Sequence, residues 1–231
     1  MKNSLIFIMC LLIPTSLFAV DITVGASMGL NAGWNTGSDW KNFGTAATQV
    51  FGSDIEFSTE RKTGFEIGAF CEIEINEFFS LQPEFSFLYT RAGLSGNILF
   101  FDIEFAATTK YFEIPVLAKF NHKTPIGKFS VFAGPSFQIM VGDMKIKATS
   151  SVASYSESIS EKIEPDNKFL IGGILGFGYQ LSLGPGILVC DIRYRRQFTG
   201  YIDDFNTRGN TIGFRAGYAV PLSFIQKKLK S

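Results

Sequence analysis

The chain is short of the residues on which most catalytic and metal sites depend. It contains 3 Cys, 1 His and 2 Trp among 231 residues. Charged residues make up 18% of it, below the roughly 25% of ordinary soluble domains. Lys+Arg and Asp+Glu number 21 each, so no basic surplus is present to neutralise phosphates. We therefore expect no nucleic-acid partner.

Phenylalanine and glycine are abundant instead. The 25 Phe favour strands, and the 23 Gly disfavour the interiors of regular helices. The length suits one all-β barrel better than two independent domains. We expect a single β domain.

The first residues have the form of an export signal. Lys2 supplies a positive start, residues 5–13 an apolar run, and Ala19 a small residue before the cleavage point. The run is too short for a membrane-spanning helix, which takes about 20 residues, so an uncleaved anchor is the weaker alternative. The sequence predicts a signal peptide over 1–19 and a single exported domain over 20–231. Of the cysteines that remain, Cys71 and Cys190 fall in separate predicted strands, and we expect two free thiols.

Apolar residues alternate strictly with small or polar residues along much of the chain. From Ile22 to Trp34, for example, every even position is apolar and every odd position is small or polar. Each alternating segment reaches the roughly 9–11 residues that a tilted strand needs to cross a membrane. The pattern predicts eight strands, at 21–34, 64–75, 80–91, 108–120, 128–142, 168–181, 187–199 and 211–224.

The connections between these strands alternate in length. Long ones (35–63, 92–107, 143–167 and 200–210) take turns with short ones (76–79, 121–127 and 182–186). Long external loops and short periplasmic turns are typical of outer-membrane barrels. The sequence thus predicts a closed, antiparallel, eight-stranded up-and-down transmembrane β-barrel with both termini in the periplasm. The apolar stretch 98–105 would prolong its third hairpin beyond the membrane.

The polar face of the predicted strands combines glycine with charges of both signs. Small residues and paired charges fill the narrow lumen of an eight-stranded barrel, so this face is assigned to the inside. The alternative is a soluble lipocalin-like barrel with the apolar face inside, whose exterior would have no need of so many glycines. The predicted lumen ion-pair network consists of Glu66, Glu72, Glu74, Glu84, Glu113, Lys119, Arg193, Arg195 and Arg215.

Aromatic residues gather at both ends of the apolar face. Membrane–water interfaces favour such girdles around an aliphatic band, which supports contact with lipid. The girdle on the long-loop side is predicted to contain Trp34, Phe65, Tyr89, Phe169 and Tyr194, and the one on the short-turn side Phe120, Phe129, Tyr179 and Phe224.

Several short motifs lie in register with the predicted strands. They are SLQPEF at 80–85, YFEIPVLAK at 111–119, FAGP at 132–135, GFGY at 176–179 and DIRY at 191–194. Together they resemble the outer-membrane β-barrel domain family, the small porin-like barrels of diderm bacteria. The resemblance implies an outer-membrane location and insertion by the envelope's barrel-assembly machinery. In such barrels the machinery reads a terminal aromatic residue; Phe224 takes that place here, although seven residues follow it.

The sequence contains few candidate catalytic residues. Small outer-membrane barrels include enzymes that use His with Ser or Asp, but His122 stands alone in a predicted periplasmic turn. Glu72 and Glu74 form a carboxylate pair that we interpret as part of the ion-pair network and not as an acid–base pair. We expect no enzyme, no catalytic residue, no metal and no cofactor.

Three functional hypotheses follow. The leading one is a non-enzymatic integral outer-membrane protein with a structural or surface-interaction role, in contact with outer-membrane lipid. Its loops 35–63 and 143–167, the second serine-rich over 150–160, would meet an external ligand or host surface. The alternative is a narrow porin or a conduit for small solutes, hydrophobic ones included. The third, an envelope enzyme, is disfavoured by the missing histidines.

Overall fold

The computed structural model describes residues 21–40, 42, 45, 58–98, 101–152, 155–201 and 207–229. The predicted signal peptide and most of the loop 35–63 lie outside this part of the chain. Its elements are β1 (Asp21–Thr36), β2 (Ser58–Glu74), β3 (Phe79–Ile98), β4 (Phe101–Thr124), β5 (Gly127–Met140), β6 (Met144–Val152), β7 (Tyr155–Ile163), β8 (Phe169–Leu183), β9 (Gly186–Gln197), β10 (Arg208–Pro221) and α3 (Leu222–Leu229).

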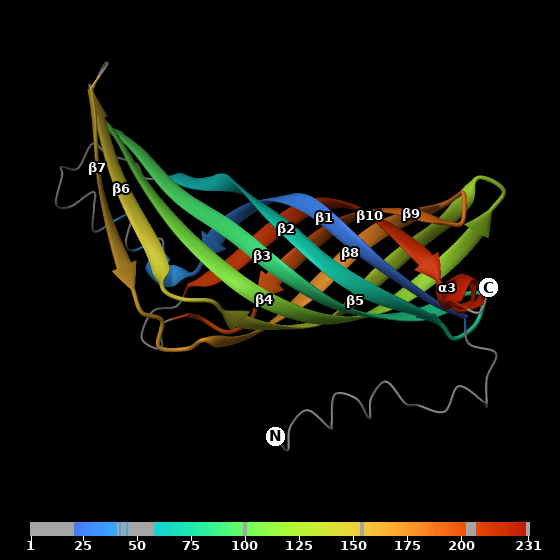
Figure 1. Cartoon of the computed structure of the whole chain (residues 1–231). Helices are drawn as coiled ribbons and strands as arrows, with labels where there is room; N and C mark the ends of the chain where they lie inside the picture. Colours follow the sequence, from blue (N-terminus) through green and yellow to red (C-terminus); the bar gives the residue numbers. More distant parts are fainter. Residues whose placement is uncertain are drawn as a thin grey trace.

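The fold is all-β, and every strand pairing is antiparallel (Figure 1). Pairings run from β1 through β2, β3, β4, β5, β8 and β9 to β10, and β10 pairs again with β1. Consecutive strands are neighbours in this circuit except where β6 and β7 intervene. The circuit determines which side chains face one another across the interior.

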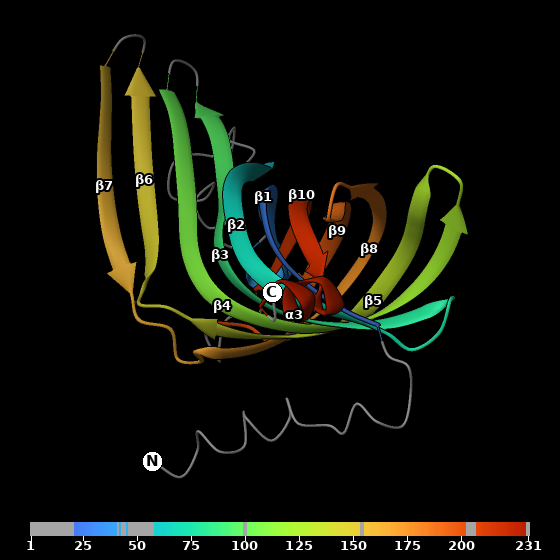
Figure 2. The ribbon, with the colours of Figure 1, turned by 45° about the vertical axis from the view of Figure 1, so that its right-hand side comes forward.

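Strands β6 and β7 correct the sequence-based prediction. The segment 143–167 was expected to be a loop, but it holds a hairpin, so the described residues contain ten strands where eight segments were predicted. Strand β6 of the hairpin pairs with the N-terminal part of β4, over Asp102–Thr108. The C-terminal part of β4 pairs with β5. Figure 2 shows β3, β4, β6 and β7 extending together beyond the other strands.

This extension has a small core of its own. Met144 packs with Trp40, Leu94 and Ala107 on the inner face of the extended sheet, and Ile146 lies against the same cluster. Met144 and Ile146 alternate with two lysines, which is a strand signal, whereas the serine-rich residues that follow have the composition of a loop. The predicted prolongation of the third hairpin does occur, because β3 continues to Ile98 and β4 begins at Phe101.

The opposite end of the molecule carries the short turns and the C-terminal helix. Here β4 continues to Thr124 and turns tightly into β5, so His122 lies in a strand and not in the predicted turn. The last predicted strand was expected to reach Phe224, but β10 ends at Pro221, which has no N–H to donate to a further ladder bond. Phe224 therefore belongs to α3, which contacts β1 and β10 (Figure 1).

The distribution of side chains is the inverse of a soluble protein's. Large apolar residues of the strands face outward; Met28 is 66% exposed and Phe214 54%. Charged residues such as Arg193 and Glu113 are fully buried inside. Among the described residues, none of the helices has the length and apolar character needed to span a bilayer.

Gly134 permits a close approach between β4 and β5. A Cβ at this position would collide with the backbone carbonyl of Val116 in the neighbouring strand. We expect Gly134→Ala to force the strands apart and to lower the free energy of unfolding by about 1–3 kcal/mol. Urea unfolding of the refolded protein measures this, with Ala133→Val, whose side chain is exposed on the outer face, as the control. Equal stability of the two variants would contradict the expectation.

Candidate functional site

The interior holds charged side chains that form three groups of ion pairs and hydrogen bonds. The central group unites Glu84 of β3, Asp191 and Arg193 of β9, and Arg215 of β10, all at most 5% exposed. Both guanidinium groups bind Glu84, each with an Nη1 to Oε2 distance of 2.9 Å. Asp191 accepts hydrogen bonds from Arg193 Nε at 2.8 Å and from Arg215 Nη2 at 2.9 Å. Two cations thus meet two carboxylates.

The strand pattern explains how this group forms. Asp191 and Arg193 are two residues apart on β9, so both point inward, and Arg215 pairs directly with Asp191 across β10. Glu84 comes from β3, which lies four strands away from β9 in either direction around the circuit. The ion pair between Arg193 and Glu84 therefore crosses the interior from one side to the other.

Aromatic rings pack against both guanidinium groups of the central group. Arg193 lies 5.4 Å from the ring centroid of Phe132, and Arg215 lies 5.8 Å from that of Phe70. Both rings are buried on the inner face. Cation–π contacts at these distances stabilise desolvated guanidinium groups. The two rings also occupy space beside the central group.

A second group lies toward the end that carries the β6–β7 hairpin. Arg195 pairs with Glu66 of β2 and, at 3.0 Å, with Glu113 of β4. Gln138 donates to Glu113 at 2.7 Å and accepts from Gln197 at 2.6 Å. This group again joins strands from different sides of the circuit.

The third group lies toward the short turns. Glu72 accepts bonds from Lys119 at 2.8 Å and from Lys128 at 2.7 Å, and Lys128 also pairs with Glu74. Lys119 donates to Gln82 at 2.8 Å as well, and Gln82 donates to Glu84 at 2.6 Å. Gln82 therefore connects the third group to the central one.

The structure places all nine charged residues named from the sequence in these ion pairs. The carboxylate of Glu74, 25% exposed, is the most open of them. Sequence reasoning left out Asp191 and Lys128, although Asp191 alternates in phase with Arg193 and Lys128 begins a predicted strand. The amides of Gln82 and Gln138 were also left out. Their positions in the alternating pattern, on the same face as the charged residues, could have predicted that these side chains point inward.

All the aromatic residues named from the sequence except Phe224 lie on the outer face of the strands. Toward the hairpin end, Trp34 stacks on Tyr194 at 6.1 Å and Phe65 stacks on Tyr89 at 5.2 Å. The other strand residues of the two girdles, called aromatic rows below, also make ring contacts: Phe169 with Phe137, Phe120 with Phe79, and Phe129 with Tyr179. Phe224, now in α3, is separate from these strand positions.

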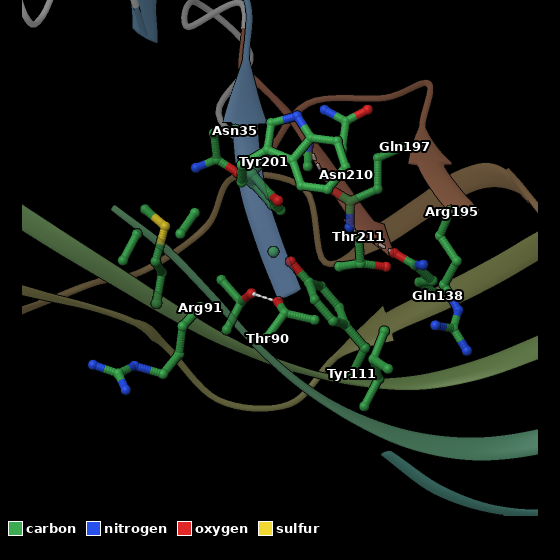
Figure 3. A pocket seen from close by; sticks show the side chains of 18 residues that line it. Asn35, Thr90, Arg91, Tyr111, Gln138, Arg195, Gln197, Tyr201, Asn210 and Thr211 are labelled. Carbon is green, nitrogen blue, oxygen red and sulfur yellow. Dashed lines mark hydrogen bonds between the residues drawn. The ribbon is translucent and has the colours of Figure 1, made fainter. Parts of the chain in front are cut away.

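A small cavity lies above the second group, toward the hairpin end. Its volume is about 20 Å³, enough for about one or two water molecules. Figure 3 shows Tyr111 and Tyr201 pointing toward one another at its edge, near Thr90. The hydroxyl of Thr90 forms a hydrogen bond of 2.7 Å with that of Thr109. Burial, together with the neighbouring Tyr111, raises the pKa of the Tyr201 hydroxyl well above its usual range.

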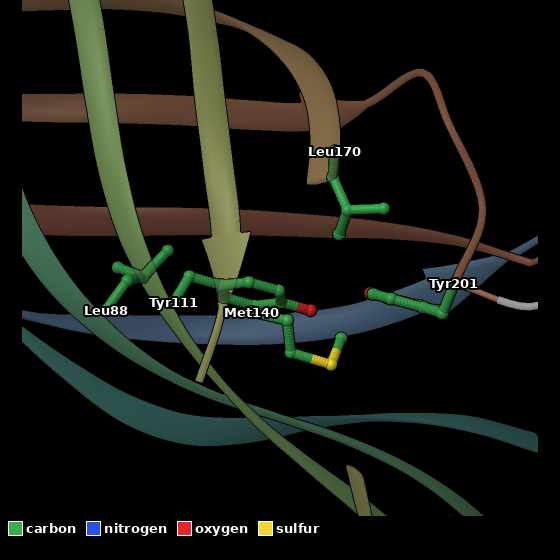
Figure 4. Close-up of a cluster of buried hydrophobic side chains, with 5 residues drawn as sticks. All are labelled: Leu88, Tyr111, Met140, Leu170 and Tyr201. Atoms are coloured by element: carbon green, nitrogen blue, oxygen red, sulfur yellow. The ribbon is translucent and has the colours of Figure 1, made fainter. Parts of the chain in front are cut away.

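A buried apolar cluster lies beside this cavity. Tyr111 and Tyr201 form a buried cluster with Leu88, Met140 and Leu170 (Figure 4). Tyr201 follows β9 and reaches back over the interior, so the cluster joins a connecting segment to the strands. The cluster packs side chains from β3, β4, β5, β8 and the segment after β9 against one another.

The site offers little catalytic geometry. Within the residues that the structure describes, no group of three or more His, Cys, Asp or Glu side chains is arranged to hold a metal ion. Glu72 and Glu74 are both engaged by Lys128, and His122 is exposed on β4. Cys71 and Cys190 are free thiols.

Comparison with known proteins identifies one family. Residues 17–203 match the family described as outer membrane protein beta-barrel domain. Among solved structures, Ail, the attachment invasion locus protein of Yersinia pestis, is 17% identical over 86% of this chain and 99% of its own, with a TM-score of 0.38. Neisserial surface protein A is 12% identical over 86% and 96%, with a TM-score of 0.40. OprG from Pseudomonas aeruginosa is 9% identical over 87% and 94%, with a TM-score of 0.32. No curated protein sequence matches.

Arg193→Ala tests the contribution of the central group. The change leaves two buried carboxylates facing the single cation Arg215, so we expect the free energy of unfolding to fall by about 3–5 kcal/mol. Guanidinium-induced unfolding of the protein in lipid vesicles, followed by tryptophan fluorescence, measures the loss. Arg208→Ala removes an exposed arginine and serves as the control. A variant as stable as the control would show that the ion pairs are dispensable.

Proposed function

Since the chain belongs to the outer membrane protein beta-barrel domain family, we propose that it is a non-enzymatic integral outer-membrane protein whose interior is plugged and whose outer end serves a structural or surface-interaction role. The family indicates the bacterial outer membrane as its location. Export by the signal peptide 1–19 and insertion by the barrel-assembly machinery belong to the same proposal, with Phe224 as the candidate assembly signal.

The proposal includes a closed eight-stranded transmembrane barrel. Three observations support it: the circuit of eight paired strands, the exposed apolar face and the aromatic rows at its two ends. Lipid cannot satisfy the hydrogen bonds of an open sheet edge, so a spanning sheet must close on itself. In this view β6 and β7 form an appendage outside the membrane and do not add to the barrel wall.

The ion pair that crosses the interior carries the proposal of a plugged lumen. Arg193 and Glu84 meet from opposite sides and are 0% exposed. Arg215, Phe70 and Phe132 fill the space around them. An eight-stranded barrel has an interior just wide enough for its own side chains, so this column leaves no aqueous path.

The extended outer end supports the surface role. β3 and β4 extend beyond the other strands of the circuit and form a sheet with β6 and β7 (Figure 2). In this proposal that sheet lies outside the membrane. Ile159 on this sheet is 73% exposed. We propose that this sheet, which includes the segment 143–167, contacts an external ligand or host surface together with the connection 35–63.

Conductance separates this proposal from the narrow-porin alternative. We expect the refolded mature protein to give no steady current in a planar bilayer, because the buried ion pairs occupy the lumen. A heat-dependent gel shift verifies that the tested protein is folded. Reproducible single-channel steps from folded protein would contradict the plug and favour a pore for small solutes.

A further inference from the structure

A hollow lined by basic residues lies on the outer face of the extended sheet. It is separate from the ion-pair groups of the interior. Its volume is about 570 Å³, and it lies over β3, β4, β6 and β7. Its charged lining consists of Arg91, Lys110, Lys145, Lys147 and Lys162, opposed by Asp143 alone. We name these five basic residues the basic patch.

The register explains how the basic patch is assembled. Arg91, Thr108, Lys145 and Lys162 are direct partners in one row across four strands. The small side chains of Thr108 and Ala106 form the floor between the long basic ones. At about 4.8 Å between strands, the row presents cations over a span of about 14 Å.

The cations of the basic patch are unneutralised. Within the described residues, none of the five forms an ion pair, and all the lysines among them are exposed. The neighbouring Lys62 differs, because it is paired with Glu60 and, at 2.7 Å, with Glu104. Like charges placed in adjacent positions repel one another, so an unpaired row is costly unless an anion binds there.

The position of the basic patch identifies the kind of anion. Tyr89 belongs to the outer aromatic row and pairs directly with Lys110. Two residues deeper on the same face lie the apolar rings of Phe87 and Phe112. Arg91 and Lys145 therefore lie at most about 7 Å beyond Tyr89 along the strands. This places them on the side of the lipid headgroups.

We propose that the basic patch binds the phosphate groups of an anionic lipid in the outer leaflet. Phosphate oxygens accept bonds from Arg91 and the lysines, while the acyl chains of the same molecule lie against the apolar face below Tyr89. A lipid satisfies both surfaces at once, whereas a free phosphate satisfies only the upper one. This inference rests on the proposed transmembrane placement of the barrel.

Binding of lipid A, a phosphorylated glycolipid, tests the proposal. The probe is bisphosphorylated lipid A, titrated by thermophoresis into the mature protein refolded in neutral-detergent micelles. We expect the triple variant Lys110→Gln, Lys145→Gln and Lys147→Gln to bind on the order of 100-fold more weakly at low salt, because each cation near an anionic surface contributes about 1 kcal/mol. A matched triple variant, Lys123→Gln, Lys168→Gln and Arg208→Gln, removes the same charge from scattered positions and should bind as the unaltered protein does.

Two further probes identify the source of the phosphate. Dephosphorylated lipid A should not bind at the patch, and inorganic pyrophosphate should compete only weakly. Equal binding by both triple variants, or by dephosphorylated lipid A, would overturn the proposal. Pyrophosphate that binds as tightly as lipid A would overturn the lipid assignment in favour of a soluble phosphate compound.

The outcome also separates this inference from the proposed function. Folding into phosphatidylcholine vesicles, read from the heat-dependent gel shift, tests the transmembrane placement by itself. Failure to fold there would contradict the proposed function and the inference together. Folding without patch-dependent binding of lipid A would contradict the inference alone.

Discussion

The burial of charge among the paired strands of the circuit is the constraint on which the rest of the structure depends. Arg193 and Arg215 are removed from water, and each is compensated by Glu84 and Asp191. Desolvation makes an unpaired charge there very costly, so the four side chains must be present together and in register. The same network brings strands from opposite sides of the circuit into contact. It therefore stabilises the relative positions of the strands as well as filling the space between them.

Register is the link between this interior and the outer surface. A slip of one residue in any strand would turn its charged side chains toward the outside and its apolar side chains inward. In β9, such a slip would expose Arg193 and bury Ile192, which is now 53% exposed. Neighbouring strands would oppose the same slip, because Asp191 pairs with Arg215 across β10. The buried ion pairs and the exposed apolar face thus reinforce a single arrangement.

The two ends of the molecule are built differently from this shared wall. At one end, tight turns and α3 close the strands with few additional residues. At the other end, β3 and β4 outgrow their neighbours, and β6 and β7 continue the sheet from β4. The longest described strand, β4, has 24 residues. Its N-terminal part pairs with β6 and its C-terminal part with β5. This change of partner lets the chain display a sheet with its own apolar core and a basic outer face without disturbing the paired circuit.

The sequence alone determined the strand character of the chain and the direction of its side chains. Alternation has a period of two residues and is a local property, so the inward phase of Glu84, Arg193 and Arg215 could be predicted without knowing the fold. The family motifs and the short turns added the order of the strands. A composition rich in Phe and Gly pointed to the same class.

Only the tertiary structure decided which charges meet and where the sheet continues. The contacts of Arg193 with Glu84, 109 residues away, depend on how the strands surround the interior, and no local pattern contains that distance. The β6–β7 hairpin was missed because its polar side chains resemble a loop, and it forms by pairing with an outer part of β4 that the sequence had assigned to a connection. The basic patch combines residues from four strands for the same reason. Local alternation determines which way each side chain faces, but non-local pairing determines its neighbours.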